Sequence, residues 1–471
     1  MRVRHPLFGE GTVLRERWWG TEYYVAFDQG LSLWVRASEV EPLSPARPRS
    51  TPPPEGIKVQ IRTGGDLEAR RMIEAFKLGI VPQYAVKTFT FGREREIQRF
   101  HQALQDFERT GGQVLLLEGE YGSGKTHLLN YFGHEGLEAG FAVARTELHP
   151  LTATPTRPKR IWRELCLSFQ VYHEHRFYTC REFVEAFVAE APLPGTHPLL
   201  TPFQRAWKRT QDHDLLLDWL LGEPLDREYL DTVHHWNLPV LLDHSSAADL
   251  YINLLNTFAY VLRELGHPGL MLLLDEGEGL FHVYWYEYHR WQMALGFLRG
   301  LIHASRGGPE LLKLHLVPGE ARTPDGVYYP AGVLDRMGLI HSGVRPMPYL
   351  FTLPSGLFTV IAFTPLFRSA YEDLKARVGP EAVLELQPLK REDLARIFDA
   401  TVDLYRRAFP GYEPEETELR RFRTWFLETY GRKGIRLFLE NLVDALDLSR
   451  HYGTLLRPSE SSAAEPGAPM G

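Results

Sequence analysis

The chain has 471 residues, of which 44% are hydrophobic and 24% are charged, and its formal net charge is −7. This is the balance of a globular protein with room for two or three domains, and it excludes disorder of the whole chain. The acidic total argues against a protein that coats nucleic acid by bulk charge, although a local basic face remains compatible with it.

The sequence also indicates the cellular compartment. No apolar run approaches the about 20 residues of a membrane span, and the N-terminus lacks the apolar core of a signal peptide. Only Cys166 and Cys180 occur, without CxxC spacing. We therefore expect a cytoplasmic protein with no membrane partner, no disulfide scaffold and no thiolate zinc site.

Residues 1–43 have the pattern of a small antiparallel β-barrel. Three short runs, TVLRERW, EYYVAF and SLWVR, alternate apolar and polar residues and are separated by turns that contain glycine. The next segment, SPARPRSTPPPEG (44–56), is rich in proline and serine and is typical of an extended linker. The pattern predicts an N-terminal domain that is separate from the rest of the chain.

From residue 57 onward the sequence predicts an α/β domain followed by helices. Apolar runs of strand length alternate with helical patterns, which is typical of a parallel sheet covered by helices. These runs are QVLLLEGE (113–120), FAVARTEL (141–148), LMLLLDEGE (270–278) and LFTVIAFTP (357–365). We assign 57–389 to this domain with a mostly helical insertion at about 150–265, 390–455 to a C-terminal helical lid, and 456–471 to a disordered tail.

The segment GEYGSGKTHLL (119–129) matches the phosphate-loop pattern GxxxxGK[ST], with a predicted strand before it and a helix after it. Glycines allow successive backbone N–H groups to turn toward phosphates, and the following helix adds the positive end of its dipole. Lys125 is expected to reach the β- and γ-phosphates, and the Thr126 hydroxyl is expected to bind Mg²⁺. The predicted ATP-binding residues are Gly119, Glu120, Tyr121, Gly122, Ser123, Gly124, Lys125, Thr126 and His127.

An acidic element completes this prediction. In LMLLLDEGE, Asp275 ends a buried strand and is the expected second Mg²⁺ partner beside Thr126. Glu276 is placed to polarise the attacking water, which favours ATP hydrolysis over nucleotide storage. Glu278 is a further carboxylate, for which an exposed position at a helix N-terminus is the favoured interpretation.

Other residues are candidates for sensing the nucleotide. Thr364, at the end of LFTVIAFTP, could contact the γ-phosphate or the water, and the alternative is an ordinary turn residue before proline. Arg436, near the start of a helix in the lid, could reach over the nucleotide, and the alternative is a solvated arginine. In a homo-oligomer a neighbouring subunit could add an arginine, for which Arg336, Arg345 and Arg368 lie in the right region.

Taken together, FGREREIQRF (91–100), the phosphate loop, the acidic strand, the strand with Thr364 and the lid with Arg436 resemble AAA+ ATPases of the initiator-loader type. More specifically, the chain resembles the ATP-binding protein family of bacteriophage exclusion (BREX) systems over about residues 57–450. The segments that carry this resemblance are RRMIEAFKLGIVP (70–82), FGREREI, LLLEGEYGSGKTHLL, DWLLGEPL (218–225) and PGLMLLLDEGEGLF, of which the first and GEYGSGKTHLL are the most telling. The resemblance implies an ATPase with ATP and Mg²⁺ as cofactors in phage defence or genome maintenance. It also implies a helicase-like protein partner, with DNA as another candidate.

Residues 3–43 separately resemble the SH3-like, tudor-like barrel at the C-terminus of UvrD-type helicases and related RNA-polymerase-binding modules. The resemblance rests on Val3, His5-Pro6, Phe8-Gly9, Gly11, Val13 and the closing AFDQG. It implies RNA polymerase or another protein as the partner of residues 1–43, while DNA binding and a purely structural role are the alternatives.

For two basic clusters, RPKRIWR (157–163) and RRFR (420–423), a solvated face is the favoured interpretation. They are nevertheless the best candidates in the chain for contacts with DNA phosphates. The favoured function is an AAA+-like ATPase coupled to DNA or to a helicase partner. The alternatives are a signalling switch that hydrolyses nucleotide slowly and a scaffold associated with RNA polymerase.

Overall fold

The computed structural model describes two sets of residues. In the N-terminal part these are 2–5, 9–17, 22–27, 32–36 and 41–42. In the remainder they are 66–149, 152–226, 229, 232–233, 235–241, 243, 247–278, 288–314, 332–334, 339–342, 347–365 and 368–453. The chain divides into two compact units, Met1–Thr63 and Gly64–Gly471.

The first unit contains a five-stranded antiparallel sheet in the order β4-β3-β2-β1-β5. Its strands are β1 (Arg2–His5), β2 (Gly9–Arg17), β3 (Glu22–Phe27), β4 (Ser32–Arg36) and β5 (Glu41–Pro42). The three predicted runs are therefore strands, and β1 and β5 are additional. Val3, Val25 and Val35 are buried, as expected for the apolar face of a small sheet. The tudor-like identity of this unit stays a prediction.

The second unit is a mixed α/β structure. Its strands are β6 (Gln113–Glu118), β7 (Ala142–Glu147), β8 (Gln170–His173), β9 (Arg176–Thr179), β10 (Leu270–Asp275), β11 (Gly332–Leu334), β12 (Ile340–Ser342), β13 (Leu357–Phe363) and β14 (Val383–Glu385). Its α-helices are α1 (Leu67–Phe76), α2 (Glu94–Thr110), α3 (Lys125–Glu138), α4 (Pro158–Ser168), α5 (Cys180–Phe183), α6 (Leu200–Trp207), α7 (His213–Leu220), α9 (Ala248–Glu264), α11 (Tyr288–Arg306), α12 (Arg368–Val378), α13 (Arg391–Ala408), α14 (Glu416–Tyr430) and α15 (Ile435–Tyr452). Short helical turns are η2 (Gln83–Ala85), η3 (Val184–Val188), η4 (Pro309–Leu312) and η5 (Pro380–Ala382).

The main sheet has seven strands in the order β14-β6-β13-β10-β7-β8-β9. The first five pair in parallel, so their carboxyl ends lie at one edge. The strand that leads to Thr364, β13, lies between the phosphate-loop strand β6 and the acidic strand β10. This order brings the three predicted site segments together, and crevices at the carboxyl ends of parallel strands are common ligand sites.

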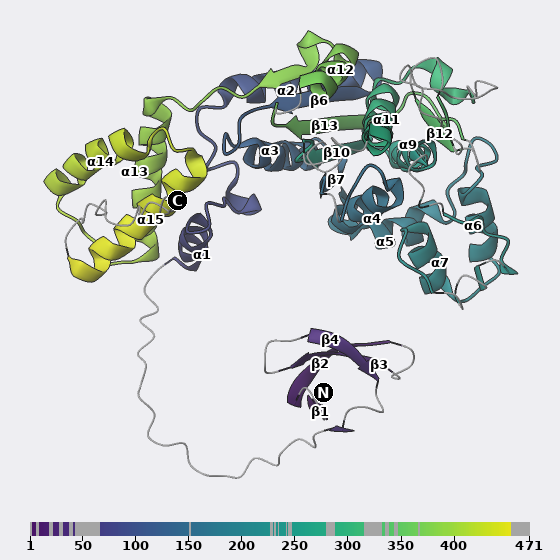
Figure 1. Ribbon diagram of the computed structural model, residues 1–471, viewed down its shortest axis with the longest axis horizontal. Helices are drawn as coiled ribbons and strands as arrows, with labels where there is room; N and C mark the ends of the chain where they lie inside the picture. Colours follow the sequence, from purple (N-terminus) through teal and green to yellow (C-terminus); the bar gives the residue numbers. More distant parts are fainter. Residues whose placement is uncertain are drawn as a thin grey trace, which may run out of the picture. The chain divides into compact units, whose positions relative to one another are not determined.

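Helices cover both faces of this sheet (Figure 1). On one face, the ring of Phe100 of α2 stacks with Phe132 of α3 and with Phe358 of β13, at centroid distances of 4.0 and 5.6 Å. On the other face, Ser305 of α11 hydrogen-bonds Thr359 at 2.7 Å between the hydroxyl oxygens. Because neighbouring residues of a strand point to opposite faces, this alternation confirms a helix-covered parallel sheet.

Residues 170–179 correct the predicted helical insertion. They form the antiparallel hairpin β8–β9, in which Gln170 pairs with Thr179. Its two turn residues, Glu174 and His175, have positive φ angles of 45° and 69°. Asparagine and glycine are the usual signals for such turns, and neither occurs here, so the sequence offered no hairpin signal.

The lid is built around a second hydrophobic core. Helices α13, α14 and α15 supply residues such as Phe398, Phe426 and Phe438, as the predicted C-terminal helical unit requires. Helix α1 joins the same core through Ile73 and Phe76, and it lies beside α13 and α15 (Figure 1). The lid therefore combines segments from both ends of the second unit.

Candidate functional site

The predicted phosphate loop lies between β6 and α3, and α3 begins at Lys125 as expected. Gly122 and Gly124 have φ angles of 76° and 99°, which side chains with a Cβ rarely adopt. A Cβ on Gly119 would lie 2.5 Å from the Ser123 hydroxyl oxygen, so the loop closes tightly on itself. These glycines allow the turn that a helix N-terminus needs to receive phosphates.

Lys125 is held inside this loop with only 6% of its surface exposed. Its Nζ donates to the carbonyl oxygens of Gly119 and Glu120 at 3.0 and 3.3 Å. It also donates to the Thr364 hydroxyl at 2.8 Å. All three acceptors are neutral, so the positive charge remains available to an anion, as the predicted role of Lys125 requires.

The predicted metal residues also meet. The Thr126 hydroxyl donates to Asp275 Oδ2 at 2.6 Å, which joins the start of α3 to the end of β10. Hydroxyl and carboxylate oxygens suit Mg²⁺, which keeps several waters and binds one or two protein groups together with substrate phosphates. In the described ranges no cluster of three or more His, Cys, Asp or Glu residues is arranged for a metal ion. The oxygens of Thr126 and Asp275 fit a Mg²⁺ ion that is bound together with nucleotide phosphates.

Glu276 follows Asp275 in an unusual backbone conformation. Its φ angle is 54°, in the left-handed region, and its N–H donates to Asp275 Oδ1 at 2.9 Å. Burial raises the pKa of the Glu276 carboxyl, and the neighbouring carboxylates Glu278 and Asp275 raise this pKa further. A carboxyl with a raised pKa beside the lysine of a phosphate loop is suited to accept a proton from water.

Glu278 is buried, with 5% of its surface exposed, so the expectation of an exposed residue is wrong. Its Oε2 accepts the backbone N–H of Thr364 at 2.9 Å. The sequence reasoning missed this because a carboxylate is normally solvated unless a partner holds it, and the partner lies 86 residues away.

The loop also contacts the lid. Arg436 is exposed and its Nη1 lies 3.5 Å from the Tyr121 hydroxyl, while a Cβ on Gly434 would lie 3.7 Å from the Gly122 carbonyl oxygen. Tyr121 is itself 76% exposed. The structure thus brings Arg436 to the phosphate loop, and its role there stays a prediction.

Arg93 supports the phosphate loop through a hydrogen bond to its backbone. It is buried, and its guanidinium donates to the carbonyl oxygens of Ser123 at 2.6 Å and Gln387 at 2.7 Å. Burial lowers the pKa of Arg93, and Glu96, 3.3 Å away, opposes this shift. Arg93 belongs to the FGREREI motif, which was the one sequence signal for this contact.

His127 was predicted among the ATP-binding residues. Its Nε2 lies 2.8 Å from the Thr90 hydroxyl oxygen, and burial lowers its pKa to about 4. The ring therefore links α3 to the segment before α2. Of the arginines suggested to act between subunits, Arg336, Arg345 and the side chain of Arg368 lie outside the described residues.

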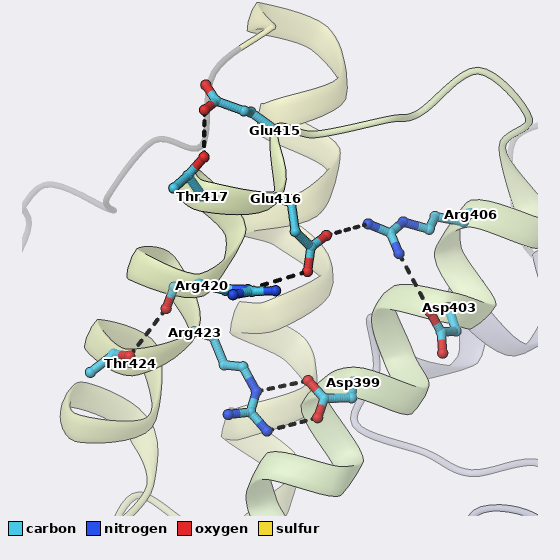
Figure 2. A network of polar contacts seen from close by, with 9 residues as sticks. All are labelled: Asp399, Asp403, Arg406, Glu415, Glu416, Thr417, Arg420, Arg423 and Thr424. Atoms are coloured by element: carbon cyan, nitrogen blue, oxygen red, sulfur yellow. Dashed lines mark hydrogen bonds and ion pairs between the residues drawn. The ribbon is translucent and has the colours of Figure 1, made fainter.

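The two basic clusters engage acidic residues of the same chain. Arg423 binds Asp399 through two hydrogen bonds of 2.7 Å, and Arg420 contacts Glu416 at 3.7 Å (Figure 2). In the other cluster, Arg163 forms an ion pair with Glu223, with 2.8 Å between Nε and Oε2. These contacts favour solvated, ion-paired faces over DNA-binding faces for both clusters.

Comparisons with known proteins give one family match. The sequence model of the family described as BREX system ATP-binding protein BrxC/D matches residues 66–192, which include the phosphate loop. No curated protein matches the chain. No helix among the described residues has the length and apolar character of a membrane span.

Two solved structures of archaeal proteins are similar to the chain. The ORC1 protein of Aeropyrum pernix in complex with DNA has 12% identity and a TM-score of 0.36, over 81% of this chain and 66% of that protein. Cdc6p from Pyrobaculum aerophilum has 13% identity and a TM-score of 0.34, over 77% and 63% respectively. The chain thus spans less than two thirds of the length of these proteins.

Proposed function

We propose that the chain is an AAA+-type ATPase that binds and hydrolyses ATP with Mg²⁺. The main support for this proposal is a pair of contacts that joins the segments at the carboxyl ends of β6, β13 and β10. Lys125 meets Thr364 at 2.8 Å, and Thr126 meets Asp275 at 2.6 Å. Lys125 binds the phosphates, and Thr126 with Asp275 holds the metal ion.

Glu276 orients the attacking water and accepts its proton, because its carboxyl follows the metal-binding Asp275 directly and its pKa is raised. Bound Mg²⁺ would neutralise charge on the phosphate oxygens. Thr364 contacts Lys125 and Arg436 contacts Tyr121, and both report whether the γ-phosphate is present. The family match over 66–192 supports a setting in bacterial phage defence. We propose that the protein acts there in the cytoplasm with DNA or a helicase-like protein, as the sequence resemblance implies.

Steady-state ATP hydrolysis tests this proposal, measured with and without single-stranded, duplex and forked DNA. Lys125→Ala should abolish ATP binding. Glu276→Gln should keep binding and lower turnover by about 100-fold, because it removes the group that activates water. Lys208→Ala and Glu264→Gln, at exposed positions on other elements, serve as matched controls and should match wild type.

The assays with DNA distinguish coupling to DNA from the signalling switch. Stimulation of several-fold by one DNA form, lost in both site variants, supports coupling to DNA. ATP binding with slow turnover that no DNA form changes would favour the signalling switch instead. A wild-type protein that neither binds nor hydrolyses ATP would contradict the ATPase proposal.

A further inference from the structure

The three residues after β10, Glu276 to Glu278, form a turn that folds back onto the end of β13. The Gly277 N–H donates to the Ala362 carbonyl oxygen at 2.9 Å, and Glu278 accepts the Thr364 N–H at the same distance. A Cβ on Gly277 would lie 2.6 Å from the Phe363 ring, so the approach requires glycine at this position. The turn that carries Glu276 is therefore tied to β13 at two points.

Thr364 connects this turn to the phosphate loop. Its N–H is held by Glu278, and its hydroxyl accepts from Lys125 at 2.8 Å. A single chain of contacts thus runs from the turn through Thr364 to the lysine that meets the phosphates. A shift of Glu278 would move Thr364 relative to Lys125 and release the turn that carries Glu276.

A buried carboxylate is an unfavourable choice for a purely architectural contact. Glu278 is 5% exposed, and its Oε2 accepts the backbone N–H of Thr364. Burying a carboxylate is costly, and a neutral acceptor would satisfy the same N–H. The contact therefore indicates a role in the site rather than in folding alone.

We propose that Glu278 is a positioning residue that holds Thr364 and Glu276 in register with Lys125 for the hydrolytic step. This inference rests on the proposed ATP hydrolysis. In this role Glu278 acts through the Thr364 N–H, which its Oε2 accepts, and not through contact with nucleotide or metal. Its removal should therefore affect turnover rather than nucleotide affinity.

Three variants test the proposal in the full-length protein: Glu278→Ala, Glu278→Asp and Glu278→Gln. Alanine removes the acceptor and aspartate shortens the reach by one methylene, so both should lower kcat about ten-fold or more while KM for ATP stays within about two-fold. Glutamine keeps an oxygen acceptor and should restore most of the turnover. Glu264→Gln is the matched control for loss of an acid far from this turn.

Hydrogen exchange of residues 357–365 gives a second readout that does not depend on turnover. The Thr364 N–H should be protected in wild type and in Glu278→Gln and should exchange at least ten-fold faster in the Ala and Asp variants. Wild-type kcat in Glu278→Ala, or unchanged protection of Thr364, overturns the inference. A rise in KM without loss of kcat also overturns it, because that pattern marks nucleotide binding.

Further outcomes would lead to different conclusions. Glu278→Gln as inactive as Glu278→Ala would make Glu278 a reacting acid and overturn the positioning role. A wild-type protein without ATP hydrolysis overturns the proposed function, whereas an active wild type with an equally active Glu278→Ala overturns this inference alone.

Discussion

Glu276 shows how the site departs from ordinary backbone geometry. Its φ angle of 54° places a bulky residue in the left-handed region, at a cost of about 1–3 kcal/mol. The hydrogen bond of Gly277 to Ala362 and that of Glu278 to Thr364 hold the conformation in place. Strain at the residue proposed to activate water is consistent with a function that glycine, although better suited to the backbone, could not perform.

His197 is a second residue whose environment determines a measurable property. It is fully buried, its Nδ1 accepts the N–H groups of Leu199 and Leu200 at 3.0 Å, and its Nε2 lies 2.9 Å from Asn253 Oδ1. Nδ1 therefore carries no proton, and Nε2 donates. Burial lowers the pKa of His197 to about 4, so the folded state favours the neutral ring.

This depressed pKa predicts acid sensitivity. Above pH 6.5 neither state binds the proton, and as the pH falls from 6.5 toward 4 only the unfolded state does so. The free energy of unfolding should then fall by about 1.4 kcal/mol per pH unit from His197. His127, with the same pKa of about 4, should contribute equally.

Urea denaturation at pH 7, 6 and 5, followed by tryptophan fluorescence, measures the slope. His197→Gln should lower the slope between pH 6.5 and 5 by about 1.4 kcal/mol per pH unit. His127 and His267, whose pKa values burial also lowers, should keep their own part of the slope. An unchanged slope in the variant would show that the His197 ring does not carry this pH dependence.

At the scale of elements, Arg93 joins three segments: the start of α2, the phosphate loop and the residues that lead into α13. Its two strongest contacts, to Ser123 and Gln387, are only 2.6 and 2.7 Å long. Arg93→Ala would leave these carbonyl oxygens without their donor and should weaken ATP affinity about ten-fold, since a hydrogen bond to a charged group is worth about 1.5–3 kcal/mol.

Arg93→Lys is the informative control. One ammonium on a shorter, non-planar head cannot serve both oxygens with the geometry of the guanidinium, so lysine should restore little of the affinity. Titration of a fluorescent ATP analogue measures the dissociation constants. Wild-type affinity in Arg93→Ala would contradict a bracing role for this residue.

At the scale of the whole molecule, the boundary between the two units makes the function separable. Residues 1–63 form one compact unit, and α1, which begins at Leu67, packs into the lid. Deletion of 1–63 keeps Asp66, whose side chain accepts the N–H groups of Glu68 and Ala69 at the start of α1. ATP hydrolysis and the melting temperature of the remaining unit should therefore match the full-length protein.

Deletion of 1–78 is the matched contrast because it also removes α1. Ile73 and Phe76 are then lost from the lid core, and truncating one such buried side chain typically costs about 2–5 kcal/mol. This shorter chain should melt at a lower temperature and lose ATP hydrolysis. Calorimetry and the hydrolysis assay check both deletions, and equal behaviour of the two would contradict the placement of α1 in the lid.

Much of the second unit follows from local sequence. Runs of buried apolar residues predicted β6, β7, β10 and β13 within one to three residues, and the glycine pattern predicted that α3 begins at Lys125. Such features depend on neighbours in the sequence, because strand pattern, turn glycines and helix starts are local properties. The pairing of Lys125 with a distant acidic strand could be expected because the phosphate-loop chemistry requires it.

Other features depended on contacts between distant residues. Glu278 is positioned by its contact with Thr364, and Arg93 by its hydrogen bond to Gln387. Helix α1 is positioned by packing against the C-terminal helices. The β8–β9 hairpin formed without the usual turn residues, since its strands are stabilised by the edge of a sheet that begins elsewhere in the chain. The sequence by itself determined the chemistry of the loop and the acidic strand. Only the tertiary structure decided which buried charges support them, because burial and hydrogen-bond partners arise when remote segments pack together.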